Sequence, residues 1–212
     1  MIRGSRQTAL VTLALALLAV VLVSAKPKPP PDYFPLRVND WWKYRSTQAS
    51  GAISEFTLAV ISEDKRADGL LRRTVELSNP NPLIRDRYVK PPGSVLLVDE
   101  EYLGSGGRAS FDPPRPILQY PLRPGASWQW SGTGRGGIRI EEASEVLPSE
   151  RVETPAGRFD AVKVVVRIAQ GGAQATKTSW YAAGIGLVRQ ATDSGGVAST
   201  TDLIDYSFKR RK

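Results

Sequence analysis

Hydrophobic and polar residues alternate along much of the chain beyond residue 35, in short runs that end at Gly, Pro, Asn or Asp. The clearest run covers residues 162–168, where three valines and an isoleucine occupy alternate positions and Lys163 and Arg167 lie between them. A period of two residues is typical of a half-buried strand, and about ten segments of the chain have it. No segment beyond residue 35 has the period of an amphipathic helix. The pattern predicts an all-β, mainly antiparallel fold, arranged as a curved sheet or an incomplete barrel.

One sequence pattern occurs twice. P-L-R-x4-W-x-aromatic ends first in Trp42 and Tyr44, and 86 positions later (42 to 128) it ends in Trp128 and Trp130. The proline fixes an extended backbone, the leucine fits a core position, and the two aromatic residues share one face of the strand that follows. The repetition predicts that the sheet is built from two related β units.

The first 25 residues have the organisation of a secretory signal peptide. Arg3 and Arg6 precede an apolar run over residues 9–23, and small residues follow up to Ala25. We predict cleavage after Ala25 and export to the periplasm or the extracellular space. The alternative is an uncleaved N-terminal membrane anchor, for which the apolar run is short because a span needs about 20 residues. Contact with a membrane is expected only through this leader, if it is retained.

The rest of the chain divides by composition. Residues 26–32 form a Pro-rich spacer, in which proline prevents a helix. Residues 33–208 form a single β domain, with sub-units at about 33–115 and 117–208. Residues 209–212 form a basic tail.

Composition excludes several kinds of chemistry. The 212 residues include no cysteine and no histidine, which removes disulfides, thiolate nucleophiles, common zinc sites and Ser-His-Asp triads. The acidic pairs Glu100-Glu101 and Glu141-Glu142 do not form a dyad by themselves, because neighbours on a strand point to opposite faces. We predict no catalytic residue, no metal site and no cofactor.

The net charge of +8 arises near the ends of the chain. Eight of the 29 basic residues lie in the leader, the spacer and the tail, which leaves 21 basic residues against 21 acidic ones. A neutral body offers no broad cationic face to a nucleic acid, so we predict no nucleic-acid binding. The G-x-G-x-x-G pattern at residues 132–137 precedes an alternating strand rather than a helix, and this context predicts a hairpin loop instead of a dinucleotide site.

Large aromatic residues are the remaining candidates for a site. Two interpretations stay open: the rings fill the core, or they line a cavity for an apolar or sugar-like ligand. Replacing Trp128 by alanine separates the two, because a core residue contributes about 3–5 kcal/mol and a cavity wall contributes little. The candidate ligand-binding residues are Trp42, Tyr44, Trp128, Trp130 and Trp180.

Three motifs in order carry a resemblance to a known group. They are Y-x-P-L followed by W-x-Y at residues 33–44, T-P-A-G-x-F-D-A at residues 154–161, and W-Y-A-x-G-I-G-L-V at residues 180–188. Together they resemble exported bacterial β-sheet proteins of unknown function. The resemblance implies a secreted antiparallel domain and supplies no catalytic residues. The chain departs from the group where a glycine of the first turn is replaced by Asn39 or Asp40, and asparagine tolerates the left-handed backbone.

These observations leave three hypotheses about function. The first is a non-catalytic protein of the cell envelope that binds an apolar, lipid-like or polymeric ligand on a concave aromatic face. The second is a structural or assembly module that binds other envelope proteins by pairing at a sheet edge. The third is a hydrolase that uses carboxylates alone.

Overall fold

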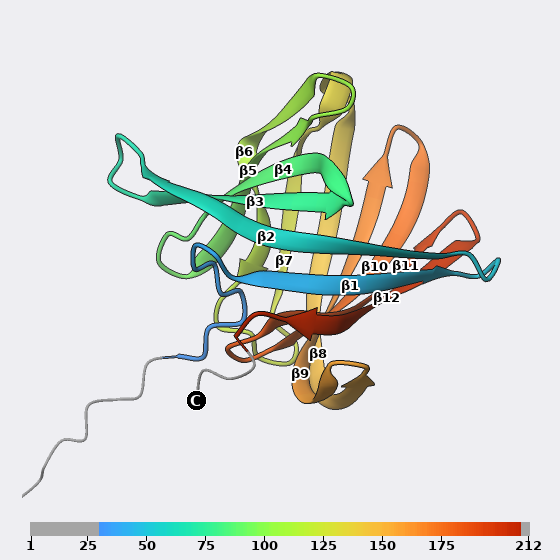
Figure 1. Ribbon diagram of the computed structural model, residues 1–212. Coiled ribbons are helices and arrows are strands. Elements are labelled where there is room, and N and C mark those ends of the chain that lie inside the picture. The colour runs from blue at the N-terminus through green and yellow to red at the C-terminus, as the bar shows by residue number, and fades with distance from the viewer. Residues whose placement is uncertain (1–29, 209–212) are drawn as a thin grey trace, which may run out of the picture. The chain divides into compact units, whose positions relative to one another are not determined.

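The alternating segments form one antiparallel sheet of twelve strands in the computed structural model, which describes residues 30–208 (Figure 1). This confirms the prediction of an all-β fold with a strongly curved sheet. The predictions for the leader, for residues 26–29 of the spacer and for the basic tail lie outside the described residues.

Each half of the chain supplies six strands. The first six are β1 (Trp41–Gln48), β2 (Ile53–Lys65), β3 (Leu71–Asn79), β4 (Asn81–Val89), β5 (Ser94–Tyr102) and β6 (Gly107–Gln119). The second six are β7 (Ser127–Thr133), β8 (Arg139–Thr154), β9 (Gly157–Gln170), β10 (Ala173–Ala182), β11 (Gly186–Ser194) and β12 (Val197–Tyr206). A single 3-10 turn, η1 (Arg135–Gly137), is the only helical element of the described residues, and it connects β7 to β8 as the hairpin loop predicted for the glycine-rich segment.

The two halves are meanders joined in the middle of the sheet. The strand order is β6-β5-β4-β3-β2-β1-β12-β11-β10-β9-β8-β7, so β1 pairs with β12, and Figure 1 shows them side by side in blue and red. Strands β6 and β7 form the two edges. Residues 120–126 connect these edges and, because a chain advances at most about 3.5 Å per residue, keep the end of β6 within about 28 Å of the start of β7.

Side chains close the boundary between β6 and β7, which we call the seam. Arg115 of β6 forms a bidentate ion pair with Glu142 of β8. The indole Nε1 of Trp130 donates a hydrogen bond of 3.1 Å to the carbonyl oxygen of Pro113. The rings of Phe111 and Trp130 meet edge to face, with centroids 5.9 Å apart. The sheet is therefore a nearly closed barrel whose seam lacks a backbone ladder among the described strands.

Equivalent turns begin the two meanders. The amide of Asn39 donates to the carbonyl of Val60, and 86 positions later the amide of Gly125 donates to the carbonyl of Val146. Asn39 has φ 72° and Gly125 has φ 85°, which is the left-handed geometry that the sequence analysis expected asparagine to tolerate. Both valines are fully buried. The common origin of the two halves stays a prediction. It would account for the matching hydrogen bonds of the two turns.

The inward faces of the strands form the core. Three clusters of buried residues follow each other along the inside of the sheet, centred on Val60 and Leu203, on Val95 and Val146, and on Leu97 with other residues near the seam. The predicted strand at residues 162–168 lies in β9, and the three valines at its alternate positions, Val162, Val164 and Val166, are buried. The core does not fill the interior completely, and this leaves the cavity described next.

Candidate functional site

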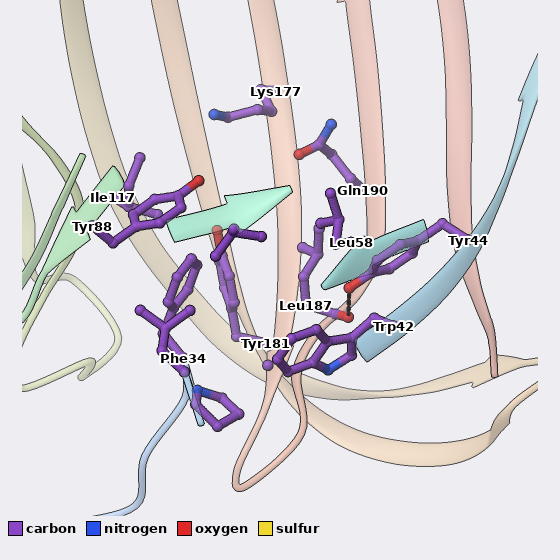
Figure 2. Close-up of a pocket in the computed structure, with 14 residues that line it drawn as sticks. Phe34, Trp42, Tyr44, Leu58, Tyr88, Ile117, Lys177, Tyr181, Leu187 and Gln190 are labelled. Carbon is purple, nitrogen blue, oxygen red and sulfur yellow. Dashed lines mark hydrogen bonds between the residues drawn. The ribbon is translucent and has the colours of Figure 1, made fainter. Parts of the chain in front are cut away.

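A cavity of about 210 Å³ lies inside the sheet between β1 and β2 on one side and β10 and β11 on the other (Figure 2). Its walls are mostly apolar and include Trp42, Tyr44, Leu58, Tyr181 and Leu187. These residues meet because the curvature of the sheet brings inward faces from both halves of the chain together. A concave surface of this composition is typical of sites for small apolar ligands.

The polar atoms of two wall residues are already bonded to the protein. The indole Nε1 of Trp42 donates to the carbonyl oxygen of Ile185 at 2.7 Å, and the hydroxyl of Tyr44 donates to the carbonyl oxygen of Leu187 at 2.9 Å (Figure 2). Burial raises the pKa of Tyr44 far above its ordinary value, so the ring stays neutral. Both rings therefore present apolar faces to the cavity.

A short N-terminal segment covers one end of the cavity. We call residues 32–36 the strap. The carboxylate of Asp32 pairs with Lys90 at 2.8 Å, and its carbonyl accepts a hydrogen bond of 2.7 Å from the amide of Gly184. Phe34 packs against Tyr88, with ring centroids 5.2 Å apart. The strap is thus fixed to both halves of the chain, and its Phe34, Pro35 and Leu36 line the cavity.

The opposite end of the cavity is polar. Lys177 of β10 and Gln190 of β11 line it, and Figure 2 shows both above the aromatic residues, away from Phe34 and Trp42. Lys177 points inward because it lies directly opposite the buried Val166 of β9, and residues in register share a face. Within residues 30–208 its amine has neither a hydrogen bond nor an ion pair. Burial lowers the pKa of Lys177 to about 8, with a further contribution from the positive charge of Arg115.

Acidic side chains also face the interior near the seam. Asp86 of β4 and Glu100 of β5 lie directly opposite each other. Tyr88 donates a 3.0 Å hydrogen bond to Asp86, and Tyr102 donates a 2.7 Å hydrogen bond to Glu100. Burial and, after it, the neighbouring charge of Glu100 raise the pKa of Asp86 to about 7. The neighbour on the chain, Glu101, instead reaches the outward-facing Arg87 at 2.5 Å, as the alternation of faces predicts.

The Asp86–Glu100 pair is the closest approach in the described chain to an acid–base dyad, because one carboxyl with a raised pKa stands beside a second carboxyl. Neither residue is among those that line the cavity. Within the same range, no group of three or more acidic side chains has the arrangement of a metal site. The interior therefore offers an apolar pocket with one amine and, separately, a carboxyl pair that does not face it.

The structure separates the five residues predicted as a ligand wall. Trp42 and Tyr44 line the cavity. Trp128 and Trp130 are buried in two other clusters, one beside Val146 and one at the seam, and they do not line it. Trp180 is half-buried on the outer face, where its indole donates to Glu150 and the amine of Lys163 lies 5.2 Å from its ring centroid. The five residues therefore do not share one wall, since only Trp42 and Tyr44 of the five line this cavity, and ligand binding by them stays a prediction.

Sequence analysis missed the residues at the two ends of the cavity. Phe34 is the unspecified position of the Y-x-P-L motif and was not a candidate, and Lys177 was not considered. One signal was present for the lysine. Lys177, Ser179 and Tyr181 occupy alternate positions that lead into the W-Y-A motif, so an inward Tyr181 implies an inward Lys177. The sequence did not indicate which face of this strand is inward.

The sequence was compared with known protein families and with curated proteins. The family model DUF3108-like matches residues 142–203, which run from β8 to β12 and include both Glu142 and Lys177. This range covers 62 of the 212 residues (142 to 203). None of the curated proteins matches the chain.

Two solved structures share the fold. One is described as an exported protein with a YmcC-like fold from Bacteroides fragilis, with a TM-score of 0.57 and 16% identity over 84% of this chain and 100% of that chain. The other is described as a lipoprotein from Parabacteroides distasonis, with a TM-score of 0.55 and 16% identity over 85% of this chain and 100% of that chain. At this identity the comparison establishes a common fold. Between residues 30 and 208, helices of the length and apolarity needed to cross a bilayer are absent.

Proposed function

We propose that this chain is an exported, non-catalytic protein that binds an elongated apolar ligand in the cavity beneath the strap. The observation that carries the proposal is the cavity itself, with rings from both halves of the sheet turned toward it. The hydroxyl of Tyr44 and the indole nitrogen of Trp42 have protein partners, so the faces left for a ligand are apolar. The signal-peptide pattern of residues 1–25 supports export, as do the descriptions of the two similar structures.

The size of the cavity restricts the ligand. A volume of about 210 Å³ is below the range of about 300–1,000 Å³ that is usual for drug-sized ligands. A single slender alkyl or acyl chain suits this space better than a bulky four-ring system such as a sterol. Each methylene group buried there contributes about 0.8 kcal/mol, so a chain of several carbons supplies useful affinity without hydrogen bonds.

Two further functions receive less support. Hydrolysis by carboxylates needs an acid pair that faces a substrate, and Asp86 and Glu100 are not part of the cavity lining. Pairing with other proteins at a sheet edge needs a free edge. The edges β6 and β7 are instead linked to each other across the seam through Arg115 and Trp130, which an added strand would have to displace.

The proposal is tested with a neutral apolar fluorophore, N-phenyl-1-naphthylamine, titrated into the purified protein. We expect a saturable rise in emission. Leu58→Trp fills the cavity from β2 and should abolish binding. The matched control, Ile53→Trp, adds the same ring on the same strand at a residue that is 65% exposed, and it should bind as the original protein does.

Two results would overturn the proposal. One is the absence of saturable binding by the original protein. The other is unchanged binding by Leu58→Trp when circular dichroism shows that the variant keeps its β structure. If Leu58→Trp does not fold, Val75→Phe at the neighbouring wall position replaces it, with the same expected loss of binding.

A further inference from the structure

The cavity contains one basic group whose partner is missing from the described chain. Lys177 lines the cavity and has no hydrogen bond or ion pair within residues 30–208. A half-buried amine in an apolar environment is costly unless an anion or several acceptors satisfy it. By contrast, Lys163 on the next strand faces outward and lies 3.4 Å from the carboxylate of Glu150. The difference makes Lys177 a candidate for contact with a ligand.

The two acidic residues whose charges act on Lys177 already have hydrogen-bond partners. Glu142 accepts two hydrogen bonds from the Arg115 guanidinium, and Glu100 accepts a hydrogen bond from the hydroxyl of Tyr102. Burial and the positive charge of Arg115 lower the pKa of Lys177, and the charges of Glu142 and Glu100 act in the opposite direction. Lys177 is therefore the basic side chain of the cavity lining that is available to bind an anion at the polar end.

The distribution of polarity along the cavity suggests how such an anion is attached. Apolar residues occupy the strap end and the middle, while Lys177 and Gln190 lie together at the other end (Figure 2). A molecule that matches this lining has an apolar tail and one compact polar head. The amide of Gln190 can donate to the same head group that an ammonium ion binds.

We propose that the ligand is a single-chain acidic amphiphile, with its acidic head group at Lys177 and Gln190 and its alkyl tail among Trp42, Tyr44 and Leu187. This inference rests on the proposed function and names its ligand class. The head group forms a charge-assisted hydrogen bond with the Lys177 amine, and the strap covers the end of the tail. Arg115 remains bound to Glu142.

The test is competition against N-phenyl-1-naphthylamine by matched ten-carbon compounds at pH 7. Decanoate carries the acidic head, decanol has the same tail with a neutral head, and acetate has the head alone. Hydrogen bonds to charged groups contribute more than neutral ones, so we expect decanoate to compete about tenfold more strongly than decanol, and acetate to compete very weakly. Decyl phosphate should compete as well as decanoate if the site recognises only the negative charge of the head group. It should compete more weakly if the site is specific for a carboxylate.

Variants identify the residue responsible. Lys177→Met keeps an unbranched side chain of similar length and should remove the preference for decanoate while leaving decanol unchanged. Lys177→Arg should retain the preference. Lys163→Met, on the outer face of the adjacent strand, is the matched control and should behave as the original protein does.

The outcomes separate the two proposals. If the fluorophore does not bind, the proposed function fails. Two results would contradict the acidic head group although the fluorophore binds: decanol competes as well as decanoate, or Lys177→Met keeps the preference for decanoate. In either case the cavity is a purely apolar site. If Lys177→Met does not fold, Lys177→Gln serves as the neutral variant with the same expectation.

Discussion

Arg115 and Glu142 join the two halves of the chain across the seam of the sheet. The guanidinium lies on β6 and is largely buried, with 15% of the side chain exposed, and the carboxylate lies on β8 and is buried, with 4% exposed. The Arg115 Nε to Glu142 Oε2 distance is 3.1 Å. The guanidinium also lies 5.8 Å from the ring centroid of Phe111 and 6.0 Å from that of Trp130. A charged pair thus occupies a place where the backbone ladder is interrupted.

Removing one partner of this pair is expected to destabilise the protein strongly. Glu142→Ala leaves the buried guanidinium of Arg115 without its carboxylate, which costs about 3–5 kcal/mol of unfolding free energy. The double variant Arg115→Met with Glu142→Leu removes both charges and should recover most of that loss. Urea unfolding of the two variants measures this. A loss below about 1 kcal/mol for Glu142→Ala would show that the seam does not depend on the pair.

The raised pKa of Asp86 predicts that the free energy of unfolding depends on pH. Its pKa is raised from 3.8 to about 7, mainly by burial and then by Glu100, so between these values the folded state holds a proton that the unfolded state has released. Its contribution to stability is therefore lost as pH rises from about 4 to 7. Asp86→Asn should leave stability unchanged at pH 4 and increase it at pH 8, by on the order of 2 kcal/mol. Equal effects at both pH values would contradict the raised pKa.

The lowered pKa of Lys177 predicts that the free energy of unfolding changes with pH in the alkaline range. Burial and Arg115 lower its pKa from 10.5 to about 8, against the opposing influence of Glu142 and Glu100. Between pH 8 and 10.5 the unfolded state binds the proton and the folded state does not, so stability rises with pH in this window. Lys177→Met should be more stable than the original protein at pH 7 by on the order of 2 kcal/mol and should lack the rise. Thermal unfolding from pH 7 to 10 compares the two, with Lys163→Met as the control.

Three tryptophan variants distinguish core, cavity wall and outer face. Trp128→Ala should lose about 3–5 kcal/mol of stability, because its ring is buried among valines, and should still bind the fluorophore if it folds. Trp180→Ala should lose about 1 kcal/mol or less, because its ring is half-exposed. Trp42→Ala should weaken fluorophore binding. Denaturant unfolding and fluorophore titration are measured on each variant. Binding lost in Trp128→Ala but kept in Trp42→Ala would reverse the assignment of the wall.

The two equivalent turns predict matched effects on stability. Asn39 and Gly125 have positive φ, which costs an alanine about 1–2 kcal/mol. Asn39→Ala and Gly125→Ala should each lose stability by about this amount, whereas Asn39→Gly should be neutral or slightly stabilising. Chemical denaturation provides the measurement. If Asn39→Ala were as stable as Asn39→Gly, the left-handed turn would not be needed at the start of β1.

The sequence predicted the strands well because a half-buried strand has a period of two residues that can be seen without a structure. The run at residues 162–168 needed no tertiary information to be recognised as β9. The repeated aromatic pattern likewise located the first strands of both meanders, β1 and β7. The residues that line the cavity were harder to predict than the strands. Trp42 and Trp128 have the same sequence context, although only Trp42 of the two lines the cavity.

By itself, the sequence determined the class of fold, the absence of cysteine and histidine chemistry, and which residues of each strand share a face. The tertiary structure decided which face is inward and which strands meet across the interior. Trp180 and Tyr181 are neighbours, so one ring had to point outward, and only the pairing of β10 with β9 fixed the choice as Trp180. The same pairing turns Lys177 into the cavity. Alternation is a local property of the backbone, whereas a cavity depends on how strongly the whole sheet curves.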